Sequence, residues 1–233
     1  MFFIPYPMIM EYPELAKAGA RAFSTEIGQE QGIQPLVPSW QAHSDKVAVV
    51  PRDTDLYGVD ALITRQPGLL IGVRTADCVP VLLCDPEHGA VGAVHSGWKG
   101  TLLAISRRAV EKMAREFGSR PEAIVAAIGP CIHQEAFEVG DEVYEHFLAA
   151  GYGAFCQRIP WQGREKWHID LPGICAYQLS QAGVKQISPS PCCTYNAHDR
   201  FYSSRWLKAD LADHRIYNCI QWLLHKGDPT GRT

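Results

Sequence analysis

The sequence predicts an α+β fold in which a mixed β-sheet is flanked by helices in α/β/α layers. Short runs rich in Val, Ile and Leu alternate with turn signals such as QPG and DPEHG, a pattern typical of strands. Residues 102–117 carry apolar side chains at helical spacing and end at Gly118, a common residue just after a helix. Some predicted strands follow each other directly and others are separated by helices, which indicates a mixed sheet.

The predicted elements follow in chain order. A short helix is expected at 14–21, before a stretch at 28–38 that is rich in Gly, Gln and Pro. The expected strands are 46–50, 61–64, 69–74, 79–84, 90–95, 124–128, 184–187, 201–204 and 215–223. The expected later helices are 102–117, 141–150 and 171–182. Because no repeat or linker divides the chain, we expect one domain over residues 1–233, with an atypical, shortened segment at 1–40.

Composition and charge argue against nucleic-acid-binding, membrane and secreted proteins. The chain has 22 Lys and Arg against 25 Asp and Glu, a net charge of −3, and no basic excess that would indicate nucleic-acid binding. No apolar run reaches the roughly 20 residues of a membrane span, and the proline-rich N-terminus lacks the basic region of a secretion signal. We therefore expect a cytoplasmic protein without a nucleic-acid or membrane partner, whose eight cysteines are reduced.

The segment 75–100 carries the clearest chemical signal. If residues 85–88 form a four-residue loop, Cys78 lies directly across from His95 on the same face of a hairpin. Directly opposed Cβ atoms are about 5 Å apart, which suits two ligands of one metal ion. A metal-free Cys–His nucleophile pair and plain burial are the alternatives. His43, which precedes a predicted strand, is a candidate third ligand on a loop.

An anion could bind beside this pair. Residues 96–100 (SGWKG) lie at a junction of strand and helix, where glycines allow close approach and free N–H groups favour negative charge. Lys99 would add a positive charge, and Asp77 adjoins Cys78. Asp77 could orient a metal ligand or act as a base.

Several motifs are specific enough to indicate a family. The segments TADCVPVLL, HSGWKG, GPCIHQEAFEVGDEV, the pair Cys193-Thr194 and FYSSR resemble the laccase-domain (polyphenol oxidase) family, whose bacterial members are purine nucleoside phosphorylases. The resemblance runs from about Trp40 to Leu224 and implies a metal held by His43, Cys78 and His95, in agreement with the cross-strand pair. The chain departs from the family pattern at Glu26, where the family has Arg, and in the short segment before His43. It also keeps only the first Arg of the family's SYRR motif, as Arg205.

The resemblance implies a metal-dependent phosphorylase. Its reaction would convert adenosine, inosine or S-methyl-5′-thioadenosine and phosphate to the free base and (methylthio)ribose 1-phosphate, with adenosine deamination as a side activity. A site with two His and one Cys leaves a fourth position open, as in catalytic zinc sites, so zinc is expected and copper is the alternative metal. We expect Asp77 and Lys99 to be catalytic, and the phosphate and purine to be held by Arg205, Arg74, Trp98 and Tyr202. A homodimer is compatible with the sequence.

Three other functions fit parts of the sequence. A copper polyphenol oxidase fits because two His and one Cys also form the core of blue-copper sites, although the nine scattered histidines include no HxH pair. A hydrolase with Cys78 and His95 as a metal-free dyad would bind no metal. A binding module without turnover is the third alternative.

Overall fold

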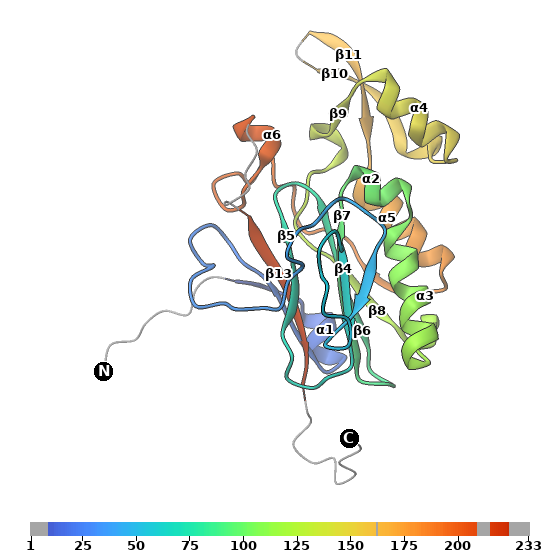
Figure 1. The fold of residues 1–233 in the computed structure, drawn as a ribbon. Helices are drawn as coiled ribbons and strands as arrows, with labels where there is room; N and C mark the ends of the chain where they lie inside the picture. Colours follow the sequence, from blue (N-terminus) through green and yellow to red (C-terminus); the bar gives the residue numbers. More distant parts are fainter. Residues whose placement is uncertain (1–8, 162, 209–214, 224–233) are drawn as a thin grey trace.

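The computed structural model describes residues 9–161, 163–208 and 215–223 (Figure 1). Its central element is a six-stranded sheet in the order β12-β8-β6-β7-β4-β3. The strands are β3 (Val47–Val49), β4 (Ala61–Thr64), β6 (Val79–Asp85), β7 (Ala90–Ser96), β8 (Val125–Ile128) and β12 (Gln186–Ser188). The outer pairs β3–β4 and β12–β8 are parallel and the inner pairs are antiparallel, so the sheet is mixed as predicted.

Helices cover one face of this sheet (Figure 1). They are α2 (Trp98–Leu102), α3 (Ile105–Phe117) and α5 (Leu171–Gln181). Val81 and Leu83 of β6 share a buried apolar cluster with Val110 and Met113 of α3 and Ile174 of α5. Burial of this cluster stabilises the layer that carries the central hairpin.

A second sheet covers the opposite face, together with the short helix α1 (Pro13–Lys17). Its order is β1-β2-β13-β5, with β1 (Met10–Glu11), β2 (Ala20–Ser24), β13 (Ile216–Trp222) and β5 (Ile71–Thr75). Leu82 and Ala93 of the central sheet pack with Ile71, Val73 and Ile220 of this one. The connection from β5 to β6, residues 76–78, therefore crosses from one sheet to the other.

A third, smaller sheet extends from the body near α4 (Asp141–Ala149), as Figure 1 shows. It pairs β10 (Cys156–Trp161), β11 (Arg164–Ile169) and β9 (Glu138–Val139). The remaining elements of the described residues are short: 3-10 helices at Pro121–Ala123, Gln134–Ala136 and Gly153–Phe155, and α6 (Ser204–Leu207).

The predicted α+β class is confirmed, and several boundaries are corrected. The layers differ from the expected α/β/α order, because the second sheet together with α1 covers the face opposite α3 and α5. The helix expected at 14–21 ends at Lys17, because Gly19 (φ +92°) turns the chain into β2. The helix expected at 102–117 is broken at Ala104, whose φ of +57° is left-handed. Residues 201–204 form no strand, since Ser203 caps α6 by accepting a hydrogen bond from the Trp206 N–H. The β10–β11 hairpin was not predicted.

Two predictions about the whole chain stand as they were. The single domain over residues 1–233 stays a prediction. The expected absence of a secretion signal also stays a prediction, because residues 1–8 lie outside the described residues. No helix among the described residues has the length and apolar character needed to cross a membrane. All eight cysteines are free thiols.

Candidate metal centre

The β6–β7 hairpin places His95 and the residue before β6 at one end of the central sheet. Its register pairs Pro80 with His95, so the prediction that Cys78 lies directly opposite His95 is wrong by two residues. The loop is shifted because Asp85 stays in β6, where its carboxylate accepts hydrogen bonds from the N–H groups of Glu87 and His88. A shift of two keeps every side chain on its face, so Cys78 and His95 still converge.

His43, Cys78 and His95 form one group of potential metal ligands. Their ligand atoms all lie within 4.8 Å of one another, and Cys78 Sγ is 3.7 Å from His43 Nε2. Gly97 borders the group: a Cβ there would overlap the His43 ring and lie 3.1 Å from Cys78 Sγ. Two imidazoles and a thiol are a donor set that zinc and copper both accept. The residues present therefore fit a bound metal ion.

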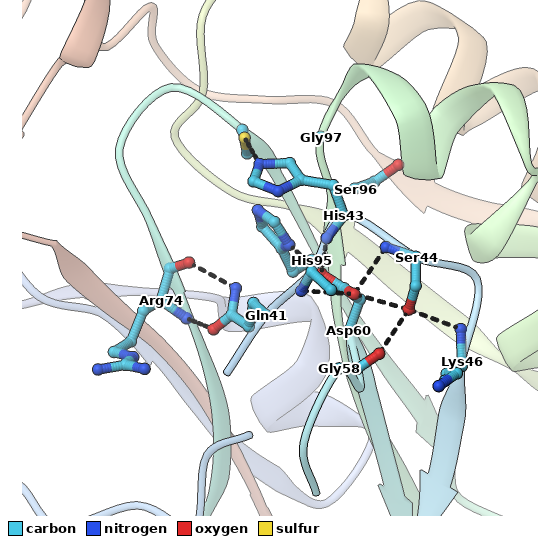
Figure 2. Close-up of polar contacts among 12 residues, drawn as sticks. Gln41, His43, Ser44, Lys46, Gly58, Asp60, Arg74, His95, Ser96 and Gly97 are labelled. Atoms are coloured by element: carbon cyan, nitrogen blue, oxygen red, sulfur yellow. Dashed lines mark hydrogen bonds and ion pairs between the residues drawn. The ribbon is translucent and has the colours of Figure 1, made fainter. Parts of the chain in front are cut away.

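Asp60 supports this group and was missed from the sequence. It is fully buried just before β4, and its carboxylate accepts a hydrogen bond from His95 Nδ1 at 2.7 Å (Figure 2). The same carboxylate contacts the loop that carries His43. An isolated Asp at the start of an apolar run was the only sequence signal, and nothing in the sequence tied it to either histidine.

Without a metal ion, the pKa values of Cys78 and His95 are shifted in opposite directions. Burial alone would raise the pKa of Cys78, but the charge of His95 and hydrogen bonds with His43 and His95 outweigh it and lower the pKa to about 6. Burial alone would lower the pKa of His95, but the Cys78 charge and the bond to Asp60 raise it to about 9. Between these values the pair is a thiolate beside an imidazolium, and a thiolate is the form that binds metal.

A cavity of about 390 Å³ opens onto the ligand group. Three arginines line it: Arg74 from β5, Arg205 from α6, and Arg215, which was not predicted, just before β13. Arg74 Nε is buried and makes no hydrogen bond within the described residues. Arg205 donates to the Glu138 carboxylate and to its backbone carbonyl, at 2.7 and 2.8 Å. Phe137 and Ile132 form an apolar part of the wall.

Asp77 lies in the cavity wall in a left-handed conformation, with φ +84°. One carboxylate oxygen accepts a hydrogen bond from Thr194 Oγ1 and the other from the Arg205 backbone N–H, each at 2.7 Å. Both oxygens are thus used to hold the cavity wall together. The catalytic role expected for Asp77 stays a prediction.

The other predicted site residues lie elsewhere. Lys99 is exposed on α2, with its Nζ 5.4 Å from the centroid of the Trp98 ring. Trp98 packs against the core, and neither it nor Lys99 nor Tyr202 lines the cavity. Glu26, at the position of the family's Arg, forms an ion pair with Arg200 at 2.7 Å.

Comparison with known proteins identifies the family. Residues 16–218 match the model of the multi-copper polyphenol oxidoreductase laccase family. The chain belongs to this laccase-domain family.

Two similar proteins have names that state an activity, and a third is a solved structure. The chain is 46% identical over 177 residues to a "Purine nucleoside phosphorylase" of Bacteroides thetaiotaomicron; the alignment covers 75% of this chain and 64% of the relative, less than two thirds of its length. It is 41% identical over 189 residues to "Adenosine deaminase RL5" of an unknown prokaryotic organism, covering 75% and 71%. The crystal structure of the Bacillus licheniformis hypothetical protein YfiH superposes with a TM-score of 0.81 at 25% identity, covering 96% and 99% of the two chains.

Proposed function

We propose that this laccase-domain protein is a metal-dependent purine nucleoside phosphorylase, with zinc at His43, Cys78 and His95. The observation that carries the proposal is one cavity that joins this ligand group to three arginines. The arginines suit phosphate, because a guanidinium can donate two parallel hydrogen bonds to it. The names of the relatives support purine nucleosides as the other substrate.

The reaction would transfer the ribosyl group from base to phosphate. A phosphate oxygen forms a bond to C1′ while the bond from C1′ to the purine nitrogen breaks, and the electron pair leaves with the base, which takes up a proton. Arg74, Arg205 and Arg215 would bind and orient the phosphate, while Ile132 and Phe137 would contact the purine. Holding both reactants in line accounts for a large part of such a rate enhancement.

Adenosine deamination is proposed as a side activity of the same cavity. When bound, the metal would supply Lewis acidity and activate water, as deamination requires. Adenosine, inosine and S-methyl-5′-thioadenosine share the purine and C1′, so all three are proposed substrates.

The test is release of base from adenosine by the zinc-loaded protein, with and without phosphate. We expect adenine only with phosphate, and a KM for phosphate at least tenfold higher in Arg205→Ala. Arg158→Ala, at an exposed position of β10, is the matched control and should leave the KM unchanged. Base release without phosphate, or inosine as the sole product, would contradict the phosphorylase proposal.

A hydrolase with Cys78 and His95 as a metal-free dyad is the second candidate, and the opposite pKa shifts of these two neighbouring side chains favour it. A thiolate beside an imidazolium could attack a substrate directly. Full activity after chelation, lost on alkylation of Cys78, would support this alternative. Loss of activity on chelation and its return with zinc would support the metal.

A further inference from the structure

We infer that Asp60 is the positioning residue that sets both histidines of the ligand group, so that one buried carboxylate controls metal affinity. The inference rests on the metal site proposed above. It is carried by the contacts of Asp60 with two separate segments, β7 and the loop before β3 (Figure 2).

The first contact fixes the orientation of His95. Asp60 Oδ1 lies 2.7 Å from His95 Nδ1, and both side chains are buried. A carboxylate only accepts hydrogen bonds, so Nδ1 must carry a proton and Nε2 is the nitrogen left for a metal. A carboxylate behind a ligating histidine is a common way to fix the tautomer and the ring orientation.

The second set of contacts fixes the loop of His43. Three consecutive backbone N–H groups, of Ala42, His43 and Ser44, donate to the Asp60 carboxylate at 3.1, 3.0 and 2.7 Å, and Ser44 Oγ donates at 2.8 Å. His43 itself has φ +58°, a left-handed conformation that is uncommon outside glycine. Converging N–H groups around an anion stabilise such a turn, so the same carboxylate holds His43 in place.

The backbone of Asp60 completes the connection. Its N–H donates to the Lys46 carbonyl at 3.0 Å, and its carbonyl accepts from the His95 N–H at 2.7 Å. Asp60 therefore ties β7, the start of β4 and the His43 loop together. Loss of its charge should displace both histidines, whereas a residue touching one ligand would affect only that ligand.

Asp60→Asn is the test variant, because the amide keeps the shape and removes the second acceptor. Each carboxylate oxygen of Asp60 accepts at least two hydrogen bonds, so in either orientation the amide NH₂ group would face at least two donors. Asp85→Asn is the matched control: Asp85 is also fully buried, accepts two backbone N–H groups and contacts a histidine, His88 Nδ1, at 2.8 Å, but lies at the hairpin loop. Asp85 belongs with Glu87 and His88 to a second group that could hold a metal, but that group contains no cysteine. The control should therefore give the same thiolate-to-cobalt band as the wild type.

The readout is Co²⁺ titration followed by the thiolate-to-cobalt absorption band. We expect Asp60→Asn to bind Co²⁺ about 10- to 100-fold more weakly than the wild type and the control. Equal affinity in Asp60→Asn and the wild type would overturn the inference while leaving the metal site intact. No Co²⁺ binding by the wild type would instead overturn the proposed metal site.

A second measurement covers the case in which Asp60→Asn does not fold. Nitrogen-15 NMR of the zinc-loaded wild type should show the single ring proton of His95 on Nδ1, in a hydrogen bond. A proton on Nε2, with Nδ1 bound to zinc, would show that Asp60 does not orient this ligand and would overturn the inference.

Discussion

Cys78 differs from the other cysteines in its electrostatic surroundings. Burial raises the pKa of the Cys84 and Cys219 thiols to about 12, and it also raises the pKa of Cys131 and Cys175. At Cys78 two imidazoles reverse this effect and lower the pKa to about 6. Near pH 7, therefore, Cys78 is a thiolate while these four are thiols.

This difference predicts selective alkylation. In chelated protein at pH 7, iodoacetamide should modify Cys78 first, because the thiolate is the nucleophile. The rate should fall as the pH drops through about 6, where the thiolate takes up a proton. Peptide mass spectrometry measures both effects. Faster labelling of another cysteine, or a midpoint near pH 9, would contradict the assigned environment.

The three residues of the ligand group could be proposed from the sequence, but Asp60 and Arg215, which lie around them, could not. Alternation along two adjacent strands predicted that Cys78 and His95 lie on one face. This prediction holds although the predicted register was wrong, because a shift of two residues leaves each side chain on the same face. Asp60 and Arg215 reach the site only through tertiary packing, with no local pattern of their own. Lys99 was predicted to be catalytic because it is a positive charge beside His95 in sequence, but on α2 its side chain is exposed to solvent.

At the scale of elements, the connection between β5 and β6 positions the cavity. It carries Asp77, which holds the start of α6 through the Arg205 N–H and holds Thr194 through its hydroxyl. The Asp77 carbonyl also accepts a hydrogen bond from the Ile132 N–H at 2.8 Å. Segments that contain Ile132, Thr194 and Arg205, all distant in sequence from Asp77, thus meet at this one residue.

Thr194→Val tests this connection. The change keeps the shape of the buried side chain and removes its hydrogen bond, so the free energy of unfolding should fall by about 1–3 kcal/mol. Because Arg205 is held by the same carboxylate, we expect the KM for phosphate to rise more than kcat falls. Denaturant unfolding and phosphate kinetics measure the two effects.

Thr25→Val is the control, since Thr25 is also fully buried and its Oγ1 accepts a hydrogen bond from the Tyr217 N–H in the second sheet. It should lose stability without a change in KM. Equal changes in KM in both variants would argue against a positioning role for Asp77.

Elements with apolar periodicity were predictable and the others were not. The central hairpin and α3 follow their hydrophobic pattern closely. Strand β10 contains Pro160, and β11 begins with three charged residues, so neither strand has a regular apolar–polar alternation along its whole length. The second sheet joins β2, β5 and β13, which are far apart in sequence, and no local signal predicts that pairing.

At the scale of the whole molecule, Asp60 links the site to stability. Burial alone would raise its pKa, but hydrogen bonds from His95 and Ser44 and the charge of His95 outweigh it, so the pKa lies below its ordinary value. A carboxyl with a lowered folded pKa stabilises the protein fully above its unfolded pKa of about 4. That contribution is lost as the pH falls through the folded value.

We therefore expect the unfolding free energy of the chelated protein to fall on acidification below about pH 4. The fall should be shallower in Asp60→Asn, which has no carboxyl to protonate at this position. Urea unfolding between pH 2.5 and 6 measures both slopes. Parallel curves for the wild type and Asp60→Asn would show that the carboxylate contributes no such stability.

The central claim is that His43, Cys78 and His95 hold one metal ion beside an arginine-lined cavity. Elemental analysis of the purified protein, beside Cys78→Ala and His43→Ala, tests it most directly. We predict close to one zinc per chain in the wild type and loss of the metal in both variants. Wild-type protein without metal, or variants that retain it in full, would contradict the claim.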